Sequence, residues 1–447
     1  MQVTETQSDG LKREFKVVVP ISELGSRLND RLASMKDEVR LKGFRPGKVP
    51  VNHLRRLFGR SAMAEIVQNV LGEVARQTLA DRGERAATPP DFVLPEDPGA
   101  TDRILAGQDD LAYTMTYEVL PAVALGNFKT IEIERPVAPP TDADIEPRLR
   151  ELAENALSYT PYEGPAKSGD RLTIGYVGKI DGEPFQGGSD ENGIVRIGSG
   201  RFIPGFEEQL DGAKSGDERT LTVTFPTDYG AANLAGKTAT FDVKVKEVAA
   251  PEELVIDESL ATRLGVASLA ELRDLIRKQI DVENTTASRQ KVKRQVLDKL
   301  DAMHSFELPP KMVEQEFENI WRQIKADREQ SGRSFEDDGT TEDAVRQDYR
   351  KIAERRVRLG LILAEVGERQ KIEVTEQEQE RAMAAQLRQF PGREQALLDY
   401  FRNNPDAVAS LRAPIFEEKV IDYILELAKV ADKNVSREEL LREDAEE

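Results

Sequence analysis

The sequence predicts a multidomain α+β protein with three folded parts. A length of 447 residues is compatible with about three domains. The apolar pattern changes along the chain: strands mixed with helices come first, alternation dominates the middle, and helical periodicity dominates the rest. A proline-rich stretch separates the first two patterns. We therefore predict an N-terminal α+β domain, a linker, a small β domain with one helix, and an all-α C-terminal domain, at residues 1–113, 114–149, 150–248 and 249–447.

Two alternating segments predict the strands of the N-terminal domain. Apolar residues occupy every second position within residues 11–20 and again, more strictly, within residues 111–119. Such alternation is typical of half-buried strands. Strands on either side of a helical region indicate a small α+β domain.

The helical region between these strands contains two amphipathic helices joined by a loop. Apolar residues recur at steps of three and four from Ile21 to Val39, which places them on one helix face. Ser22 stands where we expect the N-cap of this helix. The second helix is predicted to begin beyond Pro50 and to continue to Gly83. The loop between the helices is therefore presented at the tip of a helix pair.

The loop is positively charged in an otherwise acidic chain. Seven Lys or Arg and no Asp or Glu lie between Val39 and Ala64, whereas the formal net charge of the chain is -19. Two glycines and two prolines give the loop a stiff, exposed backbone. Such a loop suits a polyanion or an acidic protein face. An ordinary solvated turn between helices remains the alternative.

Residues 170–248 are predicted to form a separate, mostly β domain. One alternating strand contains Tyr176, and Asp181-Gly182 is a strong hairpin signal. Two further alternating segments follow. A short helical piece is expected near residues 205–210.

Helical periodicity dominates from Pro251 onward. Pro309 and Pro310 stand where a helix starts. The sequence Phe390-Pro391-Gly392 interrupts the pattern, and the acidic tail after Ala431 is expected to fray. These helices form either an ordinary core or arms whose inner faces stay partly exposed to hold other chains. Flexible apolar side chains on a charged scaffold would suit weak, unspecific binding.

The composition excludes several kinds of function. The chain has no cysteine, which excludes thiol chemistry, and only two histidines, which argues against a histidine metal site or catalytic triad. We therefore expect no metal and no cofactor. The N-terminus has neither a cationic start nor an apolar run, and the most apolar short run, Leu359 to Val366, is too short to cross a bilayer. We expect a cytoplasmic protein without a membrane partner.

Residues 170–248 lack His and Cys and contain no nucleophile–base pair, but they concentrate aromatic residues beside glycines. An apolar pocket can still accelerate rotation about a prolyl amide, because it disfavours the charge-separated planar form. The barrier to that rotation is about 18–20 kcal/mol. No proton transfer or covalent step is needed. The alternative is that these aromatic residues only fill a small β core.

Three segments of this β domain carry a known pattern: Leu172 to Phe185, Gly200 to Glu207, and Tyr229-Gly230. They resemble the FK506-binding class of peptidyl-prolyl isomerases. The resemblance implies an apolar substrate pocket in which one backbone N–H, that of Ile203, holds the substrate carbonyl. The class often carries an Asp where this chain has Gln186. The residues that the resemblance assigns to the pocket are Tyr176, Phe185, Ile203, Phe206, Tyr229 and Phe241.

The basic loop carries a second pattern, Gly-Phe-Arg-x-Gly-Lys-x-Pro. This pattern resembles the ribosome-docking motif of the trigger factor family, bacterial chaperones that meet nascent chains at the tunnel exit. The order of a docking domain, an FKBP-like isomerase domain and a helical domain agrees with that family over nearly the whole chain. Many members carry Lys where this chain has Pro46. The matching residues are Gly43, Phe44, Arg45, Gly47, Lys48 and Pro50.

The resemblance implies a ribosome-associated chaperone that binds nascent and unfolded polypeptides and isomerises prolyl bonds. Its partner would be the large ribosomal subunit near the tunnel exit, with Phe44 as an apolar anchor and Arg45 as a bidentate fork. Two alternatives stay open. One is a free cytoplasmic isomerase and holdase whose helical arms form a homodimer. The other is a nucleic-acid-binding protein that uses the basic loop.

Overall fold

The computed structural model describes residues 1–41, 44, 48–94, 97, 99–226, 229–231 and 234–442. The chain divides into two compact units. The first contains residues 1–135 and 291–431, and the second contains residues 136–290 and the chain from residue 432 onward. Both units therefore combine segments that are far apart in the sequence.

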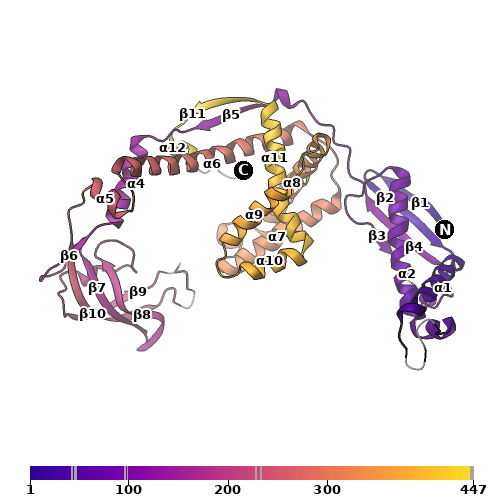
Figure 1. The fold of residues 1–447 in the computed structure, drawn as a ribbon, viewed down its shortest axis with the longest axis horizontal. Helices are drawn as coiled ribbons and strands as arrows, with labels where there is room; N and C mark the ends of the chain where they lie inside the picture. The colour runs from indigo at the N-terminus through magenta and orange to yellow at the C-terminus, as the bar shows by residue number, and fades with distance from the viewer. Residues whose placement is uncertain are drawn as a thin grey trace. The chain divides into compact units, whose positions relative to one another are not determined.

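The N-terminal body of the first unit is a four-stranded sheet packed against two long helices (Figure 1). Its elements are β1 (Gln2–Asp9), β2 (Lys12–Val19), α1 (Ile21–Glu38), α2 (Val51–Arg82), β3 (Asp91–Val93), α3 (Ala100–Leu105) and β4 (Leu111–Glu118). The sheet is antiparallel with the order β1-β2-β4-β3. Phe15 lies opposite Met115, so the inward faces of β2 and β4 form one core with the apolar faces of α1 and α2.

The predicted helix pair is confirmed, but the N-cap prediction for α1 is wrong. Helix α1 begins at Ile21 with Pro20 as its N-cap, so Ser22 lies inside the first turn. The extended backbone of Pro20 lets its carbonyl accept the N–H groups of Glu23 and Leu24 at 3.0 and 3.2 Å. The proline ring fixes this geometry without a side-chain cap.

Helix α2 begins and ends as the sequence predicts. It starts directly after Pro50 and ends at Gly83, whose φ of 63° is a left-handed conformation that glycine adopts without strain. Strand β1 is an element that the sequence does not predict. All eight of its residues are exposed, so no apolar alternation marks it.

The rest of the first unit is mainly helical. Its elements are η1 (Phe128–Thr130), β5 (Glu132–Val137), the end of α6 (Leu269–Met303), α7 (Pro310–Ser331), η3 (Glu336–Asp338), α8 (Glu342–Gln370), α9 (Glu376–Arg388), α10 (Glu394–Asn403), α11 (Pro405–Leu427) and β11 (Lys429–Asn434). One core joins α6, α8 and α11, and a second joins α7 and α8 around Phe317 and Trp321. Pro310 opens α7 as predicted. None of the helices in the described ranges has the length and apolarity that crossing a membrane requires.

The second unit contains the predicted β domain. Its elements are α4 (Asp142–Asn155), β6 (Tyr159–Pro161), β7 (Arg171–Ile180), β8 (Glu183–Arg196), η2 (Glu208–Leu210), β9 (Glu218–Thr224), β10 (Thr238–Pro251), α5 (Glu258–Arg263), the start of α6, and α12 (Arg437–Leu441). The antiparallel sheet has the order β6-β10-β7-β8, and β9 also pairs with β10. Asp181 and Gly182 join β7 to β8 with φ values of 51° and 85°, as a two-residue hairpin with two positive φ angles requires.

The expectation that the tail frays after Ala431 is wrong for residues 432–442. Strand β11 pairs with β5, and α12 follows it. Leu440 is 1% exposed, and the Arg437 guanidinium donates to Glu283 at 2.7 Å. Strand pairing, the buried Leu440 and the Arg437–Glu283 ion pair therefore help to hold this acidic segment, and its sequence pattern signals none of them.

Candidate functional site

Four of the predicted pocket residues form a continuous cluster of aromatic rings. Tyr176 on β7, Phe185 on β8 and Phe241 on β10 meet Phe206, which precedes η2. The ring centroids of Phe206 and Phe241 are 5.3 Å apart, and Tyr176 lies 6.2 Å from Phe206 and 6.0 Å from Phe241. Phe185 lies 6.0 Å from Phe241 with the rings perpendicular. These edge-to-face contacts are favourable for aromatic pairs.

Glycines on β7 and β8 make room for these rings. A Cβ atom at Gly178 would lie 2.6 Å from the Phe241 ring and 2.8 Å from the Phe185 ring. A Cβ atom at Gly193 would lie 2.8 Å from the Tyr176 ring. The rings therefore lie directly on bare backbone, which explains why glycines accompany the aromatic residues in this part of the sequence.

The two other predicted pocket residues lie against the same core. Tyr229 is 40% exposed, and its ring lies 4.7 Å from Phe225, whose ring is 6.0 Å from Phe185. Ile203 is partly buried against the core of the sheet. The structure thus brings all six predicted residues to one region of the domain.

Two phenylalanines belong to this cluster although the family resemblance assigns them no role in the pocket; Phe202 is one of the aromatic residues that the composition of residues 170–248 already singles out. Phe202 stacks on Phe206 at 5.1 Å with an interplanar angle of 15°. Phe225, which the sequence identifies only as a strand residue, links Tyr229 to Phe185. The available signal for Phe202 was its place within the Gly200 to Glu207 motif. Phe225 has no comparable signal, because alternation marks any inward strand residue.

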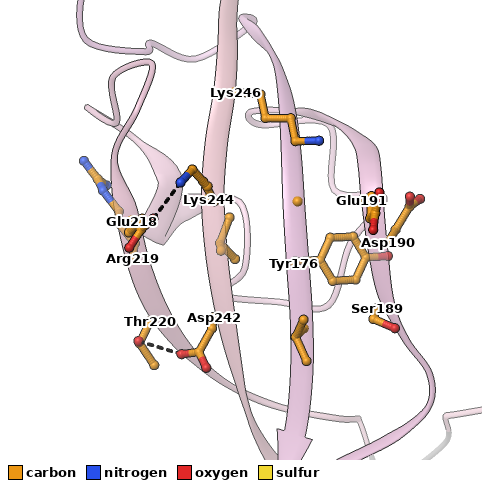
Figure 2. A pocket seen from close by; sticks show the side chains of 13 residues that line it. Tyr176, Ser189, Asp190, Glu191, Glu218, Arg219, Thr220, Asp242, Lys244 and Lys246 are labelled. Carbon is orange, nitrogen blue, oxygen red and sulfur yellow. Dashed lines mark hydrogen bonds and ion pairs between the residues drawn. The ribbon is translucent and has the colours of Figure 1, made fainter.

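A separate groove of about 680 Å³ lies between strands β7, β8, β9 and β10 (Figure 2). Seven of its thirteen lining residues are charged, and its walls include the Lys244–Glu218 ion pair at 2.9 Å and the Thr220–Asp242 hydrogen bond at 2.9 Å. Such a lining does not suit a prolyl ring, so the aromatic cluster is the better candidate site.

Tyr176 connects the aromatic cluster with this groove. Figure 2 shows its hydroxyl pointing toward β8, which carries Asp190 and Glu191. Burial, the Asp190 carboxylate and Tyr229 raise the pKa of Tyr176 above its ordinary value. The hydroxyl therefore stays protonated at neutral pH and presents a neutral dipole at the edge of the cluster.

The arrangement suits bond rotation better than acid–base chemistry. The rings of the cluster pack on the apolar core of the sheet. No group of three or more His, Cys, Asp or Glu among the described residues could hold a metal ion. A twisted amide is less polar than the planar amide, because twisting breaks the resonance. Apolar surroundings therefore favour the twisted transition state over the planar ground state.

The predicted docking motif lies only partly within the described residues. Gly43, Arg45 and Gly47 lie outside them. Phe44 is 38% exposed, and its ring lies 5.1 Å from that of His53. Lys48 is exposed and forms no ion pair with any residue for which the structure gives a position.

Pro50 anchors the end of this motif. Its carbonyl accepts the N–H groups of His53 and Leu54 at 2.9 and 3.1 Å, and it serves as the N-cap of α2. The neighbouring Val49 is 2% exposed and belongs to the core of the N-terminal body. The motif thus leads directly into a fixed helix start, with Phe44 on the solvent side.

Comparison with known proteins identifies the class of the β domain. Residues 163–246 match the FKBP-type peptidyl-prolyl cis-trans isomerase family. This range contains all six predicted pocket residues. The chain therefore includes an isomerase domain of this class.

The flanking regions match two further family models. Residues 1–152 match the bacterial trigger factor protein family, and residues 268–426 match the bacterial trigger factor C-terminus family. Trigger factor of Azorhizobium caulinodans is 53% identical over 446 residues, covering 100% of this chain and 99% of the relative. Trigger factor of Allorhizobium ampelinum is 52% identical over 444 residues, covering 99% of this chain and 90% of the relative.

The chain belongs to the trigger factor family. A solved structure of a trigger factor chaperone covers 95% of this chain with a TM-score of 0.58 and 19% sequence identity, so it supports the fold. The protein is accordingly a molecular chaperone and a peptidyl-prolyl cis-trans isomerase.

Proposed function

We propose that this chaperone docks on the large ribosomal subunit near the tunnel exit and acts there on nascent polypeptides. The observations that carry the proposal are an exposed Phe44 and an exposed Lys48 that forms no ion pair among the described residues, both within a basic loop of a chain whose formal net charge is -19. Phe44 supplies an apolar anchor, and the cations meet phosphate or acidic side chains. The proposed docking residues are Gly43, Phe44, Arg45, Gly47, Lys48 and Pro50.

The acidic remainder of the chain also bears on docking. RNA repels the acidic surface, which limits contact with the ribosome to the basic loop and favours rapid exchange over permanent attachment. A cytoplasmic location follows from this proposed partner. The competing proposal is a free isomerase and holdase, monomeric or dimeric, that acts without docking.

Co-sedimentation with large ribosomal subunits tests the docking proposal. We expect the double variant Phe44→Ala/Arg45→Ala to lose co-sedimentation while keeping its fold by circular dichroism. The matched control is Val93→Ala/Arg76→Ala, which removes an exposed apolar side chain and an exposed cation elsewhere in the same body. Unchanged co-sedimentation of the loop variant would support the free isomerase. Strong, salt-sensitive binding of naked RNA would instead support a nucleic-acid-binding protein.

We propose that prolyl isomerisation takes place at the aromatic cluster. The substrate proline lies against the rings, and the N–H of Ile203 donates to a substrate carbonyl, so that the amide is held while it twists. The support is the contiguous set of rings around Phe206 and Phe241, both nearly fully buried. The proposed pocket residues are Tyr176, Phe185, Ile203, Phe206, Tyr229 and Phe241.

A peptide isomerisation assay tests this pocket. We expect Phe241→Ala and Tyr229→Ala to lower kcat/KM, since each removes a ring that contacts the proposed substrate volume. Half-buried Tyr159, which lies outside the cluster with the Arg171 guanidinium 4.7 Å from its ring centroid, provides the control Tyr159→Ala. Wild-type rates for both pocket variants would show that the pocket is assigned wrongly.

The functional division proposed from the sequence has four parts: residues 1–113 for docking, 114–149 for connection, 150–248 for isomerisation, and 249–447 for holding polypeptides. The order of the three matched families supports this division. The first boundary falls within β4, whose last residues complete the N-terminal sheet. Limited proteolysis of the full chain would test the boundaries by the positions of the first cuts.

A further inference from the structure

The loop from Gly198 to Glu207 lies outside the strands but carries Phe202 and Phe206, two rings of the aromatic cluster. It leaves β8 after Arg196 and reaches η2 at Glu208. Gly198 and Gly200 have φ values of 79° and 66°, so the chain turns sharply here. A loop that lacks a ladder of backbone hydrogen bonds needs another acceptor for its N–H groups.

The carboxylate of Glu207 is that acceptor. It accepts the hydroxyl of Ser199 at 2.9 Å and the N–H groups of Gly200, Arg201 and Phe202 at 3.0, 3.0 and 3.2 Å. Glu207 is only 4% exposed. Four donors from consecutive residues thus converge on one buried carboxylate.

The ionised form of Glu207 is the one that this environment favours. Burial opposes ionisation, but the hydrogen bonds from Ser199, Gly200 and Phe202 outweigh it and hold the pKa of the carboxyl below its ordinary value. A carboxylate that accepts several N–H bonds is stabilised in this way. At neutral pH the loop is therefore held around a negative charge.

The N–H of Ile203, the next along the chain, does not bond to Glu207. Within the described part of the chain, the N–H of Ile203 donates to no acceptor. The carbonyl of Ile203 accepts the N–H of Phe206 at 3.0 Å, and the ring of Phe202 stacks on that of Phe206. The loop thus fixes Ile203 on both sides while leaving its donor available.

We infer that Glu207 is a positioning residue for prolyl isomerisation. Its carboxylate gathers the N–H groups of Gly200 to Phe202, sets the Phe202 ring on Phe206, and leaves the N–H of Ile203 free to hold a substrate carbonyl. This inference rests on the proposed pocket. Glu207 itself does not touch the substrate, since the loop backbone surrounds it.

The test measures kcat/KM for a prolyl peptide with the full-length chain. Glu207→Gln keeps the shape of the side chain but replaces one acceptor oxygen with a donor. We expect kcat/KM to fall about tenfold, the order that misplaced contacts cost in active sites. Amide hydrogen exchange of residues 198–206, measured on the same full-length chain, should become faster.

A second buried carboxylate of the same domain provides the matched control. Asp170 is also 4% exposed and accepts the hydroxyl of Tyr162 at 2.6 Å and the N–H of Lys167 at 2.8 Å. Asp170→Asn should lower thermal stability but leave kcat/KM near the wild-type value at a temperature where the protein is folded. A purely structural role for Glu207 predicts the same behaviour for both variants.

The results separate the inference from the pocket proposal. A loss of kcat/KM in Glu207→Gln but not in Asp170→Asn supports the inference. If Phe241→Ala loses activity and Glu207→Gln does not, the inference is wrong and the pocket stands. If both Phe241→Ala and Glu207→Gln keep the wild-type kcat/KM, the pocket assignment is wrong as well. If Glu207→Gln does not fold, Ser199→Ala decides: it removes one donor, and unchanged kcat/KM with unchanged exchange overturns the inference.

Discussion

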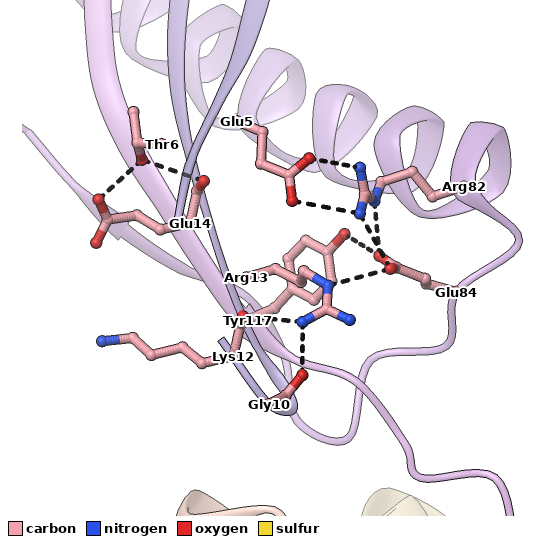
Figure 3. Close-up of polar contacts among 9 residues, drawn as sticks. All are labelled: Glu5, Thr6, Gly10, Lys12, Arg13, Glu14, Arg82, Glu84 and Tyr117. Carbon is pink, nitrogen blue, oxygen red and sulfur yellow. Dashed lines mark hydrogen bonds and ion pairs between the residues drawn. The ribbon is translucent and has the colours of Figure 1, made fainter. Parts of the chain in front are cut away.

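Glu84 in the N-terminal body and Glu207 in the isomerase domain are both largely withdrawn from water, but they bind different kinds of donor. The carboxylate of Glu84 accepts Nε of Arg13 at 3.2 Å, Nε of Arg82 at 2.9 Å and the hydroxyl of Tyr117 at 2.7 Å (Figure 3). Glu207 accepts three backbone N–H groups and one hydroxyl, all neutral.

The origin of the donors explains what each carboxylate does. Arg13, Arg82 and Tyr117 come from β2, α2 and β4, so Glu84 ties together elements that are far apart in the sequence. The donors to Glu207 lie within eight residues of it, so it shapes a loop. A carboxylate whose donors come from three different elements stabilises a domain, whereas a carboxylate among neighbouring N–H groups defines a local backbone conformation.

The largest expected effect is that of Glu84→Gln on the stability of the N-terminal body. The side chain is 16% exposed, and the substitution leaves two arginines near each other without their shared anion. We expect a loss of about 3 kcal/mol in unfolding free energy. Hydrogen exchange of β2 and β4 in the full-length chain measures it.

The control for this variant is Glu73→Gln. Glu73 pairs with Arg27 at 2.6 Å, but its side chain is 53% exposed. Solvent screens such an exposed ion pair, so we expect a much smaller loss of unfolding free energy than for Glu84→Gln. Equal losses in the two variants would show that the Glu84 network has no special role.

The second prediction concerns pH. Burial opposes ionisation of Glu84, but hydrogen bonds from Arg82, Tyr117 and Arg13 hold its pKa below the ordinary value of 4.5. The stabilisation is therefore complete above the unfolded pKa and is lost as pH falls through the lower folded pKa. The stability difference between wild type and Glu84→Gln should be largest at neutral pH and shrink below pH 4.5. Exchange rates of β4 at neutral and acidic pH measure it, and a difference that grows on acidification would contradict the network.

The third prediction compares two tyrosines on the same strand. Tyr117→Phe removes the hydroxyl that donates to Glu84 and should cost about 1 kcal/mol. Tyr113 is buried, its hydroxyl has no hydrogen-bond partner among the described residues, and burial raises its pKa to about 12. Tyr113→Phe should therefore be neutral or stabilising. Urea unfolding of both variants gives the comparison, and a larger loss for Tyr113→Phe would refute it.

The secondary structure was predictable where apolar periodicity is strong. Strand β4 alternates strictly between buried and half-buried residues, and Pro310 and Gly83 mark helix limits through their own backbone preferences. Strand β1 was not predictable, because its stability comes from pairing with β2 rather than from burial. The prediction of Ser22 as the N-cap was wrong because Pro20, two residues earlier, already provides the cap geometry.

The candidate site was predictable only for the residues that a motif names. The motif around Ile203 and Phe206 indicated the pocket, but it gave no role to Phe225, which lies one residue beyond β9 and donates its N–H to the carbonyl of Lys237 at 2.9 Å. Nor did it indicate the hydrogen-bonding roles of Glu207 and Glu84, because the sequence does not show which groups donate to a glutamate carboxylate. Those depend on backbone conformation and on distant segments that meet only in the fold.

The smallest expected effect, that of salt, separates the two carboxylates most directly. The Debye length falls from about 10 Å in 0.1 M salt to about 3 Å in 1 M salt. The arginines around Glu84 should then be partly screened, and the N-terminal body should lose about 0.5 kcal/mol, as partly exposed ion pairs do. The donors to Glu207 carry no net charge, so exchange of residues 198–206 should not respond to salt through that carboxylate. Hydrogen exchange of both regions in one sample of the full-length chain measures the two responses together. A larger salt response at residues 198–206 than at β2 and β4 would mean that neutral donors do not explain how Glu207 is held.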